Sequence, residues 1–214
     1  MARQIIVSPA GSAEWAKVIE PGEPYEEGNP PEWTLDLVLD PGKLVAHYDF
    51  ISQIEQWFQE LHGSQAKPAE HGWPFKDHLD ADKKPDGLTT VRFKRNTVSK
   101  KGNQVPGPVI VDAKKQPWDR ELLIGNGSKV KVGFTYYGWE RKGRFGISLD
   151  LAAVQVIDLV PYEAPDPTGA FGEEDGYVLP EPEETAGFKE ETATAPIASR
   201  RGPRPSGDDE EIPF

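Results

Sequence analysis

The 214-residue sequence contains no cysteine, a single methionine and no long run of apolar residues. The missing cysteines exclude disulfides, thiol catalysis and cysteine-rich zinc sites. No stretch approaches the roughly 18 consecutive apolar residues that a membrane-spanning helix needs. Residues 1–7 also lack the apolar block of a secretory signal. These absences predict a cytoplasmic protein with no membrane partner.

The sequence also lacks the common motifs of enzymes. It contains no P-loop, no dinucleotide-binding GxGxxG, no HExxH and no GxSxG. The closely spaced His71, Asp77 and His78 are a conceivable metal site, but we interpret them as ordinary loop residues. We therefore expect no catalytic residues, no metal and no cofactor.

Basic residues are outnumbered, with 24 Lys and Arg against 36 Asp and Glu and a net charge of -12. Evenly spread negative charge would argue against a nucleic-acid partner, because polyanions repel each other. The charge is uneven, however. Residues 86–145 contain 13 basic and 5 acidic residues, whereas residues 161–214 contain 4 basic and 14 acidic residues. A positively charged segment thus lies between acidic ones.

Residues 1–160 are expected to form one domain that is mainly β. Alternating apolar residues over 33–39 are typical of a half-buried strand. Apolar spacing predicts one helix over 48–61 that ends at Gly63, and residues 63–87 are predicted to be a loop. Further strands are predicted over 89–96, 109–111, 129–139 and 145–159, the last two joined by a turn at 140–143. Five strands and one helix favour a five-stranded oligonucleotide-binding (OB) barrel, with a β-sandwich as the alternative.

Residues 161–214 are rich in proline, glycine and acidic residues and contain few large apolar side chains. Such a segment buries too little apolar surface to offset its conformational entropy. We therefore predict a disordered acidic tail, which as a flexible coil of that length spans roughly 40 Å.

The basic segment combines cations with aromatic side chains on its predicted strands. Arg92 and Lys94 share one face of the 89–96 strand. The outward face of the 129–139 strand is predicted to contain Lys129, Lys131, Gly133, Thr135, Tyr137 and Trp139. Proteins that hold single strands without sequence preference use cations for the phosphates and aromatic planes for the bases. The predicted DNA-binding residues are Arg92, Lys94, Lys100, Lys101, Lys129, Lys131, Tyr137, Trp139 and Arg144.

Two stretches resemble known families. The residues GDDEEIPF, 207–214, resemble the acidic C-terminal tip of bacterial single-stranded DNA-binding proteins. The residues GSKVKVGFTYY, 127–137, followed by GRFGISLDLAAVQV, 143–156, resemble the last barrel strands of the replication single-stranded DNA-binding proteins of tailed phages.

The resemblance implies an OB-fold protein that coats single-stranded DNA during phage replication, recombination and repair in the infected bacterial cytoplasm. It also implies a tip that recruits host or phage replication and recombination proteins. The tip residues are Asp208, Asp209, Glu210, Glu211, Ile212, Pro213 and Phe214. The sequence leaves open whether the protein forms a homodimer. It also leaves open two alternative functions: an RNA-binding OB protein, and an acidic adaptor or inhibitor that binds proteins only.

Overall fold

The computed structural model describes residues 4–23, 28–162, 171–172 and 177. The chain divides into two units, Met1–Asp166 and Pro167–Phe214, and the elements below all belong to the first. Most of the predicted acidic tail, and all of the tip at residues 207–214, lie outside the described residues.

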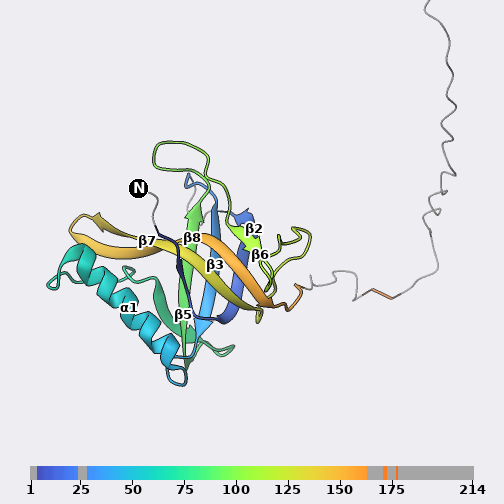
Figure 1. The fold of residues 1–214 in the computed structure, drawn as a ribbon, viewed down its shortest axis with the longest axis horizontal. Coiled ribbons are helices and arrows are strands. Elements are labelled where there is room, and N and C mark those ends of the chain that lie inside the picture. Colours follow the sequence, from blue (N-terminus) through green and yellow to red (C-terminus); the bar gives the residue numbers. More distant parts are fainter. Residues whose placement is uncertain (1–3, 24–27, 163–170, 173–176, 178–214) are drawn as a thin grey trace, which may run out of the picture. The chain divides into compact units, whose positions relative to one another are not determined.

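Strands dominate the described part of the first unit, which contains eight strands and one helix (Figure 1). The prediction of a mainly β fold with one main helix is therefore confirmed. In chain order the elements are β1 (Ile6–Val7), β2 (Gly11–Gly22), β3 (Glu32–Leu39), α1 (Val45–His62), β4 (Phe75–Leu79), β5 (Pro85–Asn96), β6 (Val109–Val111), β7 (Lys129–Arg141) and β8 (Arg144–Asp158).

Five of the strands pair in a closed circuit in the order β7, β2, β3, β5 and β8, and β8 pairs again with β7. The longest pairing is the antiparallel β7–β8 hairpin, from Lys129–Asp158 to Arg141–Arg144. Two pairings of the circuit are short: β2 pairs with β7 through Gly11–Val130 and Ser12–Lys129, and β5 pairs with β8 in parallel through Phe93–Leu149 and Lys94–Asp150. β1, β4 and β6 pair with β7, β5 and β8, respectively.

The core lies inside this circuit because alternate residues of each strand point inward. The predicted apolar face of β3 is confirmed, since Leu35, Leu37 and Leu39 are at most 1% exposed. The buried side chains of the other strands complete the core, among them Val91, Phe93, Val130, Val132, Phe134, Leu149 and Leu151.

The helix α1 packs its apolar stripe against β7 and β8 (Figure 1). Phe50, Ile54 and Phe58 are its buried apolar residues, one turn apart. Trp57 stacks on Tyr136 of β7 with ring centroids 4.5 Å apart. The predicted stop is confirmed, because Gly63 has φ 87° and donates its N–H to the Gln59 carbonyl at 2.7 Å. Within the described residues, this helix and its neighbours offer no segment apolar and long enough to cross a membrane.

One prediction about local structure is wrong, and one strand was not predicted. The segment 63–87 is not all loop, because it contains β4 and the start of β5. The strand β2 was not predicted, since a bulge between Glu14 and Lys17 interrupts its alternation. The predicted turn at 140–143 tightens to Lys142 and Gly143, whose φ angles of 53° and 73° are typical of a two-residue type I′ hairpin turn.

His78 ties β2 to the β4–β5 hairpin. Its Nδ1 lies 2.7 Å from Oδ2 of Asp86, and its Nε2 lies 3.2 Å from Oε1 of Glu14. Burial acts to lower the pKa of His78, but the hydrogen bonds and attraction to the two carboxylates outweigh it and raise the pKa above its ordinary value. The protonated ring donates a hydrogen bond from each nitrogen, so the folded state favours the charged form.

This linkage predicts a stability that depends on pH. A raised pKa in the folded state stabilises the protein fully below the unfolded His pKa of about 6.5, and the gain is lost as the pH rises through the folded pKa. We expect wild type to melt at a higher temperature than His78→Gln in mild acid, with the difference shrinking as the pH rises. Thermal melts across this range measure it.

The matched control is His71→Gln, since His71 is an exposed histidine outside this cluster. Its difference in melting temperature from wild type should not follow the same trend. A difference between wild type and His78→Gln that stays constant with pH would contradict the assignment.

Candidate nucleic-acid interface

Two adjoining hollows lie where β3 and β5 meet the end of the β7–β8 hairpin. Their volumes are about 470 Å³ and 590 Å³, and both are bordered by Glu70, His71 and Trp139. We call the continuous depression the groove. It is lined by Glu32, Thr34, Ala69, Glu70, His71, Trp73, Pro74, Phe75, Lys76, Thr90, Arg92, Lys94, Trp139, Arg141, Lys142, Arg144, Ile147, Ser148 and Leu149.

One wall of the groove is the segment 69–74, which bridges the sparsely paired β5 and β8. The Ala69 N–H donates to the Phe145 carbonyl, and the Ile147 N–H donates to the Gly72 carbonyl, both at 2.9 Å. On the other side, the Arg92 N–H donates to the Pro74 carbonyl at 2.7 Å. Only glycine fits at 72, because a Cβ there would collide with the Phe145 carbonyl oxygen. Backbone hydrogen bonds therefore fix this wall to both strands.

Aromatic rings are held in the groove with one side supported by the protein. Trp73 and Phe75 stack with ring centroids 5.1 Å apart, and Trp73 also packs on Phe58 of α1. Trp139 lies across Gly146 of β8, where a Cβ would overlap its indole ring. All three groove rings are half-buried. Such rings offer a free face on which another flat group can stack.

The cations on the floor of the groove have acidic partners from β3. Arg92 donates two hydrogen bonds of 2.7 Å to the carboxylate of Asp36, which raises the pKa of the guanidinium despite its partial burial. Lys94 pairs with Glu32 at 3.3 Å. Arg92 remains 56% exposed at its side chain while Asp36 is 6% exposed. The floor therefore presents an oriented guanidinium whose charge is largely balanced.

The hairpin end of the groove is different, because its cations are unbalanced. Arg141, Lys142 and Arg144 are exposed there, and Lys76 of β4 is exposed beside the neighbouring hollow. None of the four makes an ion pair with another described residue. The groove thus combines half-buried aromatic rings with unpaired positive charge at one end. This arrangement suits a flexible chain that carries flat groups and regular negative charges.

The structure brings together four of the predicted DNA-binding residues, because Arg92, Lys94, Trp139 and Arg144 all line the groove. Lys100 and Lys101 are exposed in the loop between β5 and β6, which extends beyond the strand ends (Figure 1). Tyr137 is half-buried opposite Ser148 and is not among the lining residues.

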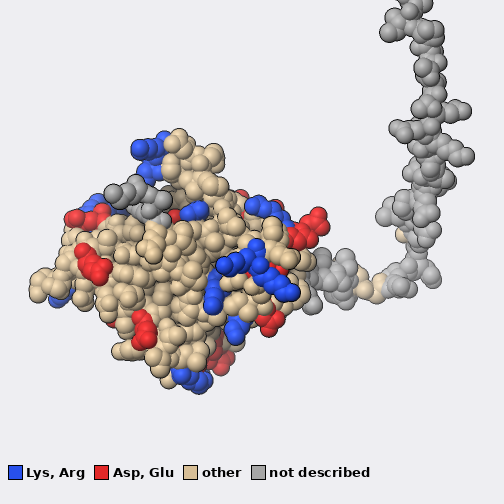
Figure 2. All heavy atoms as spheres, in the orientation of Figure 1, with Lys and Arg blue, Asp and Glu red and all other residues tan. Residues whose placement is uncertain are grey.

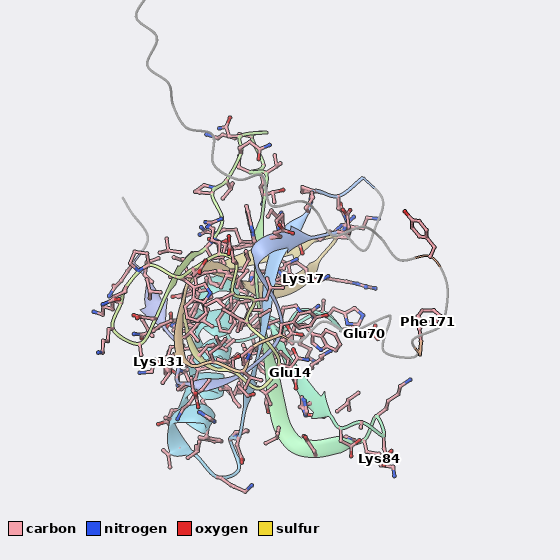
Figure 3. The ribbon with its side chains drawn as sticks, turned by 90° about the vertical axis from the view of Figure 1, so that its right-hand side faces the viewer. Glu14, Lys17, Glu70, Lys84, Lys131 and Phe171 are labelled. Carbon is pink, nitrogen blue, oxygen red and sulfur yellow. The ribbon has the colours of Figure 1, made fainter. Side chains whose placement is uncertain are left out.

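Lys129 and Lys131 lie at the other end of β7. Ten residues separate Lys129 from Trp139, which is about 33 Å along a strand. Figure 3 shows Lys131 and Glu70, a groove residue, on opposite sides of the ribbon. The predicted outward face of β7 is not exposed along its whole length, since Gly133 and Thr135 in its middle are buried.

The sequence analysis missed several groove residues. Trp73, Phe75 and Lys76 belong to the segment 63–87 that was predicted to be a loop, and the spacing of the two aromatic rings was the available signal. Arg141 and Lys142 were missed because both fell in the predicted turn at 140–143, although Arg141 belongs to β7 and only Lys142 to the turn. Among the described residues, no group of three His, Asp or Glu side chains is placed to hold a metal ion.

The contact between Trp139 and Gly146 generates a prediction. In Gly146→Ala the indole ring must leave its position, because the new methyl group meets ring atoms rather than backbone. We expect the fold to be retained and acrylamide quenching of tryptophan fluorescence to increase. The increase should vanish in a Trp139→Phe background, which removes that indole from the signal.

The control is Gly42→Ala, where a Cβ would make an ordinary 3.6 Å contact with Asp40. Its quenching should match wild type. Equal quenching of Gly146→Ala and wild type would show that the ring does not rest on Gly146.

Comparisons with known proteins agree with this architecture. No family model matches the sequence. The single-stranded DNA-binding protein of Escherichia phage T7 is 27% identical over 208 residues, covering 83% of this chain and 86% of that protein. The crystal structure of gp2.5, a single-stranded DNA-binding protein encoded by bacteriophage T7, has a TM-score of 0.56 and 24% identity over 81% of this chain and 100% of that one.

A second solved structure shares the fold at lower identity. The single-stranded DNA-binding protein of bacteriophage Enc34, in complex with single-stranded DNA, has a TM-score of 0.56 and 18% identity over 74% of this chain and 89% of that one. The mainly β fold with its main helix therefore matches an OB-like fold. The chain is thus similar in sequence to one phage single-stranded DNA-binding protein along most of both chains, and it shares its fold with the solved structures of two.

Proposed function

We propose that this chain is a phage protein that binds single-stranded DNA without sequence preference, with the groove as its binding site. The observation that carries the proposal is the combination of half-buried aromatic rings with unpaired cations in one depression. The relationship to phage single-stranded DNA-binding proteins supports it independently. We also propose that the closed circuit of strands is the OB barrel expected from the sequence.

In this proposal the aromatic residues of the groove bind bases and its cations bind phosphates. Bases stack on Trp139 and on the Trp73–Phe75 pair, since every base has a π-face and stacking tolerates any sequence. Phosphates are held by the unpaired cations at the hairpin end and by Lys76. Arg92 contributes through the donors that Asp36 leaves free, with its orientation fixed by the bidentate pair. Binding of this kind needs neither metal nor cofactor.

We further propose that the protein coats exposed strands during replication, recombination and repair in the infected cell. The segment 207–214, which lies outside the described residues, would recruit replication and recombination proteins. Its acidic run steers it towards basic surfaces, and Phe214 supplies apolar area for a pocket.

Substitutions in the groove separate stacking from charge. Trp139→Ala should weaken oligo-dT binding by about 1–3 kcal/mol and leave the salt dependence nearly unchanged. Arg144→Gln should reduce the slope of log K against log salt by about 0.7, the share of one phosphate on a single strand. Titrations at several salt concentrations measure both effects.

Tyr48→Ala is the matched control, because Tyr48 is an aromatic residue of α1 that is 61% exposed and absent from the groove. It should bind like wild type. If Trp139→Ala also binds like wild type at every salt concentration, the groove is not the site. Tighter binding to oligo-U than to oligo-dT of equal length would indicate an RNA-binding protein instead.

Removal of residues 207–214 provides a separate test of the acidic segment. The segment carries four side-chain carboxylates, which in this proposal compete with DNA for the groove cations. Its deletion should therefore tighten binding of single-stranded DNA, most strongly at low salt. Removing only residues 212–214 keeps the carboxylates and should change affinity much less. An affinity unaltered by the larger deletion at every salt concentration would contradict the competition.

A further inference from the structure

Trp15 is a large aromatic side chain that the fold leaves outside its core. It is 66% exposed, although burying an indole would be favourable. Its backbone is left-handed, with φ 49°, which is unfavourable for a residue with a Cβ. It lies in the β2 bulge between Glu14 and Lys17, and bulges commonly re-aim a side chain. An exposed tryptophan held in a strained position points to a ligand.

The neighbours of Trp15 bring it to the end of β7 that is remote from the groove. The Trp15 N–H donates to Oδ1 of Asn126 at 2.9 Å. Three residues separate Asn126 from Lys129, so their Cα atoms lie within about 11 Å. Lys129 itself pairs with Ser12 of β2. Trp15 and Lys129 therefore belong to one region of the surface.

Further lysines continue this region across the neighbouring strands. Lys131 pairs with Gln155 of β8. The amide nitrogen of Gln155 donates to the Ala113 carbonyl at 3.2 Å, directly before Lys114 and Lys115 in the loop after β6. The lysines thus lie on β7 and in the loop after β6, with Gln155 of β8 between the two groups.

These lysines are not neutralised by ion pairs, although Asp158 lies opposite Lys129 where β7 pairs with β8. None of the four makes an ion pair with another described residue. The Asp112 carboxylate beside them is engaged by the N–H groups of Lys114 and Gln116, both at 2.8 Å. Figure 2 shows Lys and Arg side chains gathered on the face to which Lys131 belongs (Figure 3). In the groove, by contrast, Arg92 and Lys94 have carboxylate partners.

We propose that Trp15, Lys114, Lys115, Lys129 and Lys131 form a second surface for single-stranded nucleic acid, separate from the groove. A base stacks on Trp15, and the lysines hold the adjoining phosphates. The inference rests on the proposed function, because this surface binds the same class of ligand as the groove. The nucleic acid on this surface is either a continuation of the molecule that occupies the groove or a second molecule.

The experiment compares full-length variants in titrations with short and long oligo-dT, of about 8 and 40 nucleotides. Trp15→Gly removes the ring and suits the left-handed backbone, so the variant should fold. Wild type should bind two short oligonucleotides per chain at low salt, whereas Trp15→Gly and Lys129→Gln/Lys131→Gln should each bind one. Trp15→Phe keeps a ring and should restore the second.

Titration with the long oligonucleotide shows whether one nucleic-acid molecule contacts both surfaces or two molecules bind separately. If the strand continues from the groove, Trp15→Gly should lower its affinity by about 5- to 100-fold, the equivalent of one stacked base. If a second strand is held, only the number of short oligonucleotides should fall. The control Lys83→Gln/Lys84→Gln removes the same charge from the turn after β4 and should retain wild-type binding.

Wild-type stoichiometry and affinity in both Trp15→Gly and the Lys129→Gln/Lys131→Gln variant would overturn the inference. So would a lysine variant that loses only binding of a peptide of residues 207–214, since the surface would then take an acidic peptide. Loss of binding in Trp139→Ala alone would leave the groove as the one site. Absence of any binding by wild type would instead overturn the proposed function.

Discussion

The pairing of β7 with β8 is the interaction on which the rest of the structure depends. It closes the circuit of strands, and its inward side chains, such as Val132, Phe134 and Leu149, supply much of the core. Beyond the core the same hairpin continues to the Lys142–Gly143 turn and carries Trp139 with the unpaired cations. One pairing therefore provides both the stability of the domain and the position of its groove.

Ion pairs across strands explain why a strongly acidic chain presents basic surfaces. Part of the acidity of residues 1–85 is used internally, since Asp36 and Glu32 pair with Arg92 and Lys94, and Glu14 contacts His78. The pairs orient the cations of β5 and balance much of their charge, while the Arg92 side chain stays more than half exposed. The free charge collects where strands end, at the hairpin tip and at the far end of β7.

Regular patterns in the sequence predicted β3 and α1 well, because Leu35, Leu37 and Leu39 follow the period of a strand and Phe50, Ile54 and Phe58 that of a helix. The short β6 was predicted from its run of three apolar residues. β2 escaped prediction since its bulge at Trp15 breaks the period of two. For the site, Arg92 and Lys94 were predicted on one face, but their carboxylate partners depend on the register of β3 with β5, which the sequence does not encode locally. Lys131 and Trp139 were predicted on the same face of one strand, but they lie near opposite ends of β7, and only Trp139 lines the groove.

The contact between Trp139 and Gly146 has an evolutionary consequence. The indole occupies the space in which any side chain at 146 would begin, so position 146 is not free to change while the ring stays in place. A larger residue at 146 becomes acceptable only after the aromatic ring at 139 has been lost or has moved. Any selection that keeps the aromatic ring at 139 therefore also keeps the buried glycine seven residues away.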